Sequence, residues 1–181
     1  MTELPPVKWF QILDSTNNEM KRQLQRLDNL SVIAAVNQTS GRGQGDHVWT
    51  SAPGENATFS LLLRHDSGLL ARDSGLINLM MGAAMRTFFR EYGIEVWMKP
   101  PNDIWVGPRK ICGMLIENVL KGKFVDTTIL GIGVNVNQKV FSDNLPNPVS
   151  MSLLTGKEYD VKEIIERLRE VIVSQLPDLL P

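Results

Sequence analysis

Residues 31–64 read SVIAAVNQTSGRGQGDHVWTSAPGENATFSLLLR, two apolar runs separated by a long polar loop. Both runs, 31–38 and 58–64, are short and rich in aliphatic residues, which is typical of buried strands. The loop between them, 39–56, holds three glycines within five positions, one arginine and a tryptophan. Because glycine lets backbone N–H groups approach an anion closely, such a loop is suited to fold over a phosphate-bearing ligand. The stretch therefore predicts a strand, a mobile ligand-covering loop and a second strand.

Amphipathic helices are predicted on either side of this unit. Apolar residues recur at helical spacing over 15–27, with Ser15 as the N-cap, and over 74–92, with Gly93 as the C-cap. A closing helix over 161–176 carries isoleucine, leucine and valine on one face.

The rest of the chain reads as a meander of strands. They are expected over 94–98, 104–106, 110–119 and 124–137, with a break at 100–101, turns at 107–108 and 121–123, and a loop marked by Pro146 and Pro148. This order of elements predicts an α+β fold with a mixed, largely antiparallel sheet flanked by helices. No linker of altered composition divides the chain, so one domain spanning 1–181 is expected.

The bulk properties narrow the classes of partner. Lys and Arg total 19 against 20 acidic residues, so the net charge of -1 gives no general attraction to nucleic acid or to an acidic membrane. The single cysteine, Cys112, fits a reducing compartment and is expected in the core. The first ten residues lack the pattern of a signal peptide, and no apolar run approaches the length of a membrane span. We expect a cytoplasmic protein.

Polar residues interrupt several apolar runs near the ends of predicted strands. They are Asn102, Asp103, Lys110, Glu117, Asn135 and Asn137. Buried polar groups are costly unless a partner satisfies them, so these positions either face a ligand or occupy turns and exposed faces. His47 and His65 are the only histidines and have no acid or cysteine at ligand spacing, so no metal site built by protein alone is expected. Neither a Walker motif nor a hydrolase nucleophile elbow is present.

Taken together and in this order, several blocks resemble the catalytic domain of biotin protein ligases. They are Ser15-Thr16-Asn17, Gln38, Gly41 to Trp49, Lys99 to Asp103, Arg109 to Glu117 and Gly131 to Asn135. The resemblance implies a fold like that of class II aminoacyl-tRNA synthetases and a two-step reaction. Biotin and ATP, with Mg²⁺, give biotinyl-5′-adenylate and pyrophosphate. The biotinyl group then passes to a lysine of a biotin carboxyl carrier protein.

The resemblance also implies roles for individual residues. Lys110, Arg42 and Asp103 would be catalytic, with Asp103 acting on the acceptor lysine or helping to hold Mg²⁺. The biotin-binding set would be Ser15, Thr16, Asn17, Gln38, Gly41, Arg42, Gly43, Gln44, Lys110 and Gly113. Among these, Ser15, Thr16 and Gln38 would contact the ureido ring. Trp49, Asn102 and Asn135 would bind the nucleotide, with Trp49 packed on the adenine.

The chain also departs from the family pattern. Gln44 stands where many bacterial members carry a second arginine, and Pro100 stands where tryptophan is common. The small C-terminal β-barrel domain that usually follows the closing helix is expected to be absent, as is an N-terminal DNA-binding domain.

A non-catalytic module that binds biotin or biotinyl-adenylate is the main alternative function. A lipoate or octanoate transferase is disfavoured because an acyl chain needs an apolar tunnel. A homodimer formed through an exposed strand is left open.

Overall fold

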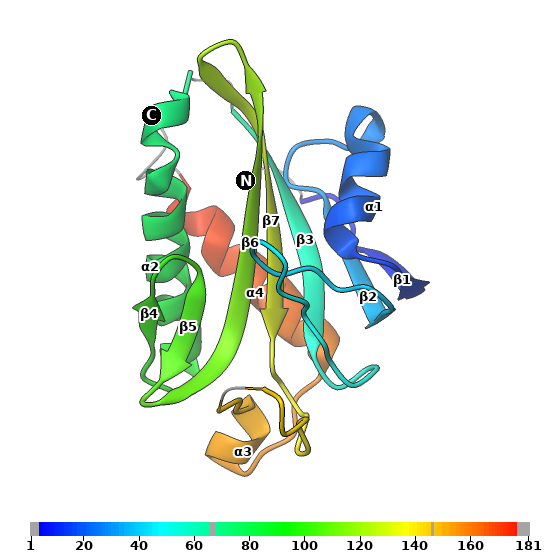
Figure 1. The fold of residues 1–181 in the computed structure, drawn as a ribbon, viewed down its shortest axis with the longest axis vertical. Coiled ribbons are helices and arrows are strands. Elements are labelled where there is room, and N and C mark those ends of the chain that lie inside the picture. The colour runs from blue at the N-terminus through cyan, green and yellow to red at the C-terminus, as the bar shows by residue number, and fades with distance from the viewer. Residues whose placement is uncertain (1–3, 66–67, 146, 177–181) are drawn as a thin grey trace.

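The computed structural model describes residues 4–65, 68–145 and 147–176, and its centre is a seven-stranded sheet (Figure 1). The strand order is β1-β2-β3-β7-β6-β5-β4. The strands are β1 (Lys8–Leu13), β2 (Val32–Gln38), β3 (Ala57–Arg64), β4 (Trp97–Lys99), β5 (Asp103–Val106), β6 (Arg109–Lys121) and β7 (Phe124–Val134). Only the β1–β2 pair is parallel, and the other five pairs are antiparallel. The predicted fold class is therefore confirmed.

The helices cover both faces of this sheet. They are α1 (Thr16–Gln23), α2 (Gly75–Glu91), α3 (Met151–Thr155) and α4 (Val161–Gln175), with short 3₁₀ turns at Leu24–Arg26 and Ala71–Asp73. Helices α2 and α4 pack together on one face, and α1 lies on the other face against β2, β3 and β7. Among the described residues, no helix has the length and apolar character needed to cross a bilayer.

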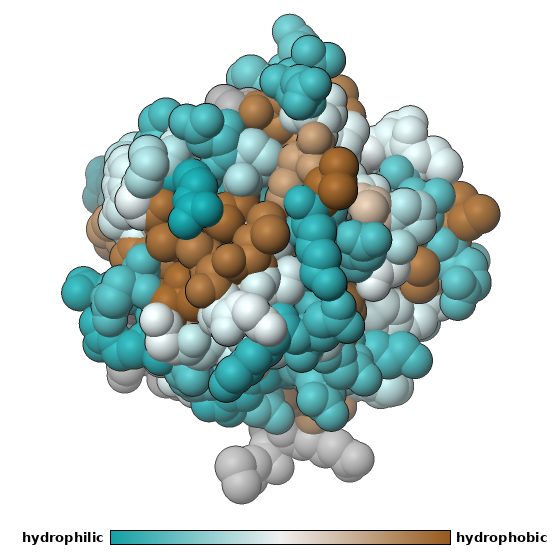
Figure 2. All heavy atoms as spheres, turned by 90° about the horizontal axis from the view of Figure 1, so that it is seen from below, coloured by the Kyte–Doolittle hydropathy of each residue, from teal (hydrophilic) through white to brown (hydrophobic). Residues whose placement is uncertain are grey.

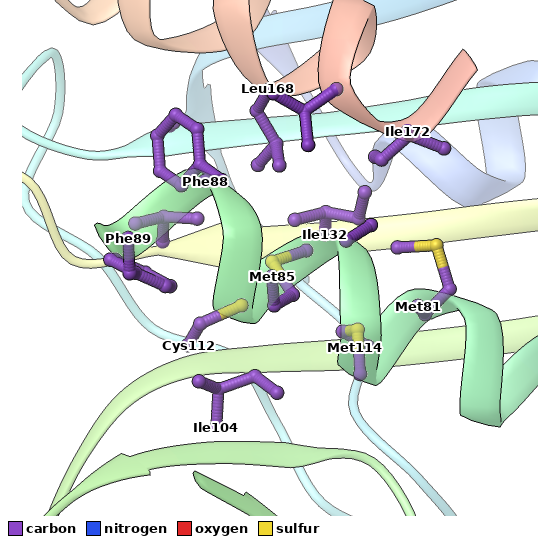
Figure 3. Close-up of a cluster of buried hydrophobic side chains, with 14 of the residues drawn as sticks. Met81, Met85, Phe88, Phe89, Ile104, Cys112, Met114, Ile132, Leu168 and Ile172 are labelled. Carbon is purple, nitrogen blue, oxygen red and sulfur yellow. The ribbon is translucent and has the colours of Figure 1, made fainter. Parts of the chain in front are cut away.

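The larger core lies between the sheet and the α2–α4 pair. Figure 3 shows side chains that meet there from α2 (Met81, Met85, Phe88 and Phe89), from α4 (Leu168 and Ile172) and from the strands (Ile104, Cys112, Met114 and Ile132). Alternate residues of β2 and β3 pack on opposite faces of the sheet, because successive side chains of a strand point to opposite sides. Val32 and Leu61 enter this core, whereas Ile33 and Leu62 join the smaller cluster under α1. Both strands are thus buried on both faces, as their apolar runs predict.

Several elements differ from the sequence-based expectation. Strand β1 was not predicted, because its residues are at best half-buried and therefore show no clear apolar alternation. The short helix α3 was also missed. The strand expected at 94–98 pairs only from Trp97 onward, and the strand expected to reach residue 137 ends at Val134. The helix expected to reach residue 27 ends at residue 23 and continues as a 3₁₀ turn.

Two expectations fall partly outside the described residues: the loop marker Pro146, and the first three residues of the chain. The other loop marker, Pro148, lies beside Lys110 through an isolated parallel bridge. The Pro100–Pro101 peptide bond is cis. On the face seen from below, an apolar area is bordered by hydrophilic residues (Figure 2).

Candidate active site

A cavity of about 410 Å³ opens at one end of the sheet, between β6, β7, the start of α1 and the glycine-rich loop. The predicted site residues that line it are Ser15, Thr16, Asn17, Gln38, Arg42, Gly43, Gln44, Trp49, Asn102, Asp103, Lys110, Gly113 and Asn135. Gly41 does not line it directly. A Cβ on Gly41 would lie 3.1 Å from Gln38 Nε2 and would overlap the Trp49 carbonyl, so the loop passes here only with glycine. The fold thus brings together blocks that are up to 120 residues apart in the chain.

The charged centre of the cavity is an ion pair between neighbouring strands. Lys110 Nζ on β6 lies 2.7 Å from Asp103 Oδ1 on β5, and both side chains are about a quarter exposed, at 27% and 26%. The backbone of Lys110 is held on its other side: its N–H donates to the Asn147 carbonyl and its carbonyl accepts from Val149 N–H, each at 2.9 Å. The ammonium therefore has a fixed position with access to the cavity.

The indole of Trp49 lies against two strand glycines. A Cβ on Gly133 would overlap the ring, and one on Gly113 would lie 3.0 Å from Trp49 Cζ3. Lys110 Nζ is 5.8 Å from the centroid of the same ring. Trp49 Nε1 is buried and has no hydrogen-bond partner among the described residues. The two glycines thus admit a flat aromatic group to the floor of the cavity.

Neutral polar side chains form another part of the cavity wall. Ser15, Thr16 and Asn17 are 2–4% exposed at the beginning of α1. Gln38, the last residue of β2, accepts a hydrogen bond at Oε1 from the backbone N–H of Thr16 at 2.8 Å. The end of one strand and the start of one helix are thereby joined, which leaves the Gln38 amide nitrogen as a donor.

Arg42 of the loop is anchored by Glu117. Its two terminal nitrogens donate to Glu117 Oε1 and Oε2 at 2.9 and 3.1 Å. Lys21 and Asn17 donate to the same carboxylate at 2.8 and 2.9 Å. Burial raises the pKa of Glu117, but the hydrogen bonds from Lys21, Asn17 and Arg42 outweigh it, so the pKa lies below its usual value. Glu117 is not among the cavity-lining residues. It lies behind the cavity wall and binds Asn17 and Arg42, which line the cavity.

The candidate asparagines have backbone partners. Asn135 is 3% exposed, and its Nδ2 donates to the Val149 carbonyl at 3.1 Å. Asn102 Nδ2 donates to the Met114 carbonyl. Asn137 lies outside the cavity and pairs with the backbone of Tyr159 at 2.8 and 3.0 Å. Of the two alternatives left open by the sequence, a structural role therefore holds for Asn137, whereas Asn102 and Asn135 combine structural bonds with a place at the cavity.

Sequence reasoning assigned no individual role to several residues at or beside the site, including Lys99, which stands in one of the ordered blocks. Lys99 and Trp105 line the cavity together, with Lys99 Nζ 4.4 Å from the Trp105 ring centroid. Ser60, fully buried, hydrogen-bonds to the start of α1. The sequence could have indicated it, because Ser60 is a hydroxyl residue within a mostly apolar strand. Cys112 is fully buried, as expected, and burial raises the pKa of its thiol. The described residues contain no cluster of three metal-ligating side chains.

The fold and the cavity define an α+β domain with a cavity at which the ammonium of Lys110 is held in a fixed position. The model of the biotin/lipoate A/B protein ligase family matches residues 9–135. The chain belongs to this family.

Named relatives agree with this assignment. The chain is 33% identical over 143 residues to the bifunctional ligase/repressor BirA of Bacillus spizizenii, and 30% over 139 residues to that of Escherichia coli. These matches cover 76% and 75% of the chain but only 43% and 42% of the relatives, so the chain spans less than half the length of these curated relatives. A biotin--[acetyl-CoA-carboxylase] ligase of Paracoccus denitrificans is 28% identical over 165 residues, which cover 86% of the chain and 66% of that protein.

Solved structures show the same fold. The biotin protein ligase of Aquifex aeolicus in complex with biotin and ATP superposes with a TM-score of 0.84 at 26% identity, over 98% of this chain and 72% of that one. The biotin acetyl coenzyme A carboxylase synthetase of Helicobacter pylori with bound biotinylated ATP superposes with a TM-score of 0.68 at 26% identity, over 94% and 74%.

Proposed function

We propose that the chain is a biotin protein ligase, which activates biotin with ATP and transfers the biotinyl group to a lysine of a biotin carboxyl carrier domain in the cytoplasm. The observation that carries the proposal is the convergence of Lys110, Arg42 and Gln38 on one cavity. They come from β6, the glycine-rich loop and β2, so the folding of the chain is what brings them together. Relatives that match 76% and 86% of the chain are named ligases of this kind, which supports the proposal.

In the first step a carboxylate oxygen of biotin attacks the α-phosphorus of ATP. A new C–O–P link forms, and the bond to pyrophosphate breaks. Negative charge accumulates on the α-phosphate oxygens, so fixed cations and N–H donors aimed there lower the barrier. Lys110 would supply the main cation. Arg42 would close with the loop and exclude water, which otherwise hydrolyses the mixed anhydride.

In the second step the amine of the acceptor lysine attacks the acyl carbon, and AMP leaves with the bonding electron pair. The attacking amine must lose a proton. Asp103 is the only carboxylate among the described cavity residues, so it would accept that proton or steer the ammonium of the incoming lysine. Its ion pair with Lys110, at 2.7 Å, supports a shared role for the two groups in the reaction.

Mg²⁺ would enter with the triphosphate of ATP. One carboxylate among the described cavity residues is too few for a cage built by protein alone, whereas Mg²⁺ commonly binds through one or two carboxylates plus substrate phosphates. The donor set therefore fits Mg-ATP as the substrate, with Asp103 as the residue able to contact the ion.

Biotin-dependent exchange of pyrophosphate into ATP tests the first step. We expect exchange by the wild-type chain, and a loss of about 10²- to 10³-fold in Lys110→Ala, because one preorganised contact to the developing charge is removed. Lys139→Ala is the matched control, since Lys139 is exposed and pairs with the exposed Glu158. Biotin binding without any exchange would instead support the non-catalytic module.

Mass spectrometry of a carrier domain incubated with the chain, biotin and Mg-ATP tests the second step. We expect the mass of the carrier domain to increase by one biotinyl group.

A further inference from the structure

The glycine-rich loop contains a small hairpin of its own. The N–H of Trp49 donates to the Gly41 carbonyl at 2.9 Å, and the N–H of Gly43 donates to the His47 carbonyl at 2.8 Å. An antiparallel bridge joins residue 42 to residue 48 between these bonds. We call residues 41–49 the lid hairpin, because most of them line the cavity. Since its two arms are hydrogen-bonded to each other, the hairpin can open and close as one piece.

One side chain connects the lid hairpin to the rest of the protein by hydrogen bonds. Within the part of the chain that the structure describes, Arg42 is the only residue of this hairpin whose side chain forms hydrogen bonds or an ion pair with residues outside it. Trp49 packs on Gly133, but its Nε1 has no hydrogen-bond partner among the same residues. The closed position of the hairpin therefore depends on the contacts of Arg42 and on the packing of Trp49.

The carboxylate that accepts from Arg42 is also held by helix α1. Lys21 Nζ donates to Glu117 Oε1 at 2.8 Å, and Asn17 Nδ2 donates to Glu117 Oε2 at 2.9 Å. Arg42 donates to the same two oxygens at 2.9 and 3.1 Å. A contact through two parallel hydrogen bonds fixes the direction of the guanidinium as well as its distance. The lid hairpin thus closes onto an anchor whose position α1 sets independently.

The positive charge of Arg42 is directed toward this anchor. Its Nη1 donates to Glu117 Oε2 and to Asn18 Oδ1, each at 3.1 Å, and its Nη2 donates to Glu117 Oε1. Three of the five guanidinium N–H groups are thereby used. Glu117 does not line the cavity, whereas Asp103, the carboxylate partner of Lys110, does. Lys110 therefore keeps its charge at the cavity, and Arg42 is paired behind the wall.

We infer that Arg42 and Glu117 are positioning residues. Their contact holds the lid hairpin closed, and Arg42 acts on the reaction through Glu117 and not as a cation on the phosphate. This differs from the catalytic role that the resemblance implies for Arg42. The inference rests on the proposed function, because biotin and ATP are the ligands that the closed hairpin would cover. Since the hairpin has to open before a ligand leaves, the contact should govern how long biotin stays bound.

The kinetics of biotin binding, measured by surface plasmon resonance on the immobilised chain, test the contact from both sides. Arg42→Met and Glu117→Gln should each speed dissociation about 5- to 10-fold, because both partners are only partly buried. The association rate should change less than about 2-fold, since biotin enters while the hairpin is open. The double variant R42M/E117Q should dissociate no faster than Arg42→Met, because one contact cannot be lost twice.

Biotin-dependent exchange of pyrophosphate into ATP separates this role from direct action on the phosphate. If Arg42 acts through Glu117, kcat/KM for biotin should fall about 5- to 10-fold in Arg42→Met and in Glu117→Gln, and no further in the double variant. A cation on the phosphate predicts a different pattern. Arg42→Met alone would then slow exchange about 10²- to 10³-fold, and Glu117→Gln would leave the rate unchanged or raise it by releasing the guanidinium.

Hydrogen exchange of the ligand-free chain shows the hairpin directly. Exchange over 41–49 should be faster than in wild type in both single variants. Arg167→Met is the matched control, because Arg167 also binds a glutamate, Glu91, through both of its oxygens but lies on α4. It should change neither this exchange nor biotin dissociation. Thermal melting identifies a variant that fails to fold, and Glu117→Asp, which keeps the charge but shortens the reach, then replaces Glu117→Gln.

The outcomes separate the inference from the proposed function. Faster dissociation in both single variants, without addition in the double variant, supports the inference. If wild type binds biotin and folded variants of Glu117 leave its dissociation unchanged, or if only Arg42→Met slows pyrophosphate exchange, the inference is wrong and the proposed function stands. If wild type binds no biotin, the proposed function is wrong, and hydrogen exchange over 41–49 alone decides whether Glu117 holds the hairpin closed.

Discussion

At the scale of single residues, the site depends on positions where only one residue type fits. Gly113 and Gly133 leave room for an indole ring, and Gly131 leaves room for an amide. These glycines lie in regular strands, where their freedom to adopt positive φ is not used. They matter because they have no side chain, so a neighbouring group can approach the sheet closely.

Gly133→Ala should displace Trp49. Its new methyl group would overlap the indole, and overpacking of this kind costs about 1–3 kcal/mol. We expect a lower free energy of unfolding in urea and a higher KM for ATP. Gly75→Ala is the control, because a Cβ there meets nothing within 4 Å. Equal stabilities of the two variants would show that Trp49 moves freely.

Glu117 should make stability depend on pH in the acid range. Its pKa in the folded protein is below the ordinary value of 4.5, so its stabilisation is present above pH 4.5 and is lost as the pH falls through the lower folded-state pKa. At neutral pH, Glu117→Gln should reduce the free energy of unfolding by about 1 kcal/mol, and the difference from wild type should vanish in strong acid.

The control for this titration is Glu158→Gln, which removes an exposed ion pair with Lys139. It should change the unfolding curve little at any pH, because exposed pairs contribute little. A Glu117→Gln difference that persists undiminished at low pH would contradict the assignment to ionisation.

At the scale of elements, a buried arginine joins the last helix to the beginning of the chain. Arg169 of α4 is 2% exposed, and its Nη2 donates to the carbonyls of Pro5 and Leu30 at 2.6 and 3.0 Å. These carbonyls precede β1 and β2, the only parallel pair of the sheet. The arginine therefore fastens α4 to the segments that lead into these strands.

Arg169→Met should destabilise the protein by about 3 kcal/mol, because the partly buried carbonyls of Pro5 and Leu30 lose their charged donor while the volume of the side chain is kept. Arg167→Met is the matched control on the same helix. Arg167 is half-exposed and pairs with Glu91 and Glu170, so its loss should cost less than about 1 kcal/mol. Urea unfolding measures both, and equal losses would refute the role given to Arg169.

The elements also show where sequence reasoning succeeds. Helix α2 was predicted within one residue at each end, because its apolar face is broad and Gly93, at φ 72°, ends it. Strand β1 was missed because it lies at the edge of the sheet, with every residue at best half-buried. Its strand character comes from pairing with β2, a partner that lies more than twenty residues away.

At the scale of the whole molecule, a buried glutamine links the two loops that border the cavity. Gln138 Oε1 accepts from Ala52 N–H at 3.1 Å and from Asn56 Nδ2, and its Nε2 donates to the Val140 carbonyl at 2.8 Å. The glycine-rich loop 39–56 and the segment 138–145 are thereby tied together. Phe141 and Leu145 of that segment line the cavity.

Hydrogen exchange should report this link. With biotin bound, we expect slower exchange over 39–56 and also over 138–145 in the wild-type chain. In Gln138→Ala the slowing should stay confined to 39–56, because the contact that transmits it is gone. Mass-spectrometric exchange with and without biotin measures both segments. Equal protection of 138–145 in the variant would rule out this route of coupling.

The sequence by itself determined the class of fold, the glycine-rich loop and the ordered blocks that mark the family, because periodicity and loop chemistry are local properties. Single-domain organisation and dimerisation stay predictions. Only the tertiary structure decided that Glu117 stands behind the cavity wall, where it binds Asn17, Lys21 and Arg42. It also showed that Asn137 serves the backbone of Tyr159. A polar residue in an apolar run signals that it needs a partner, but which partner it finds depends on segments brought beside it from up to 100 residues away.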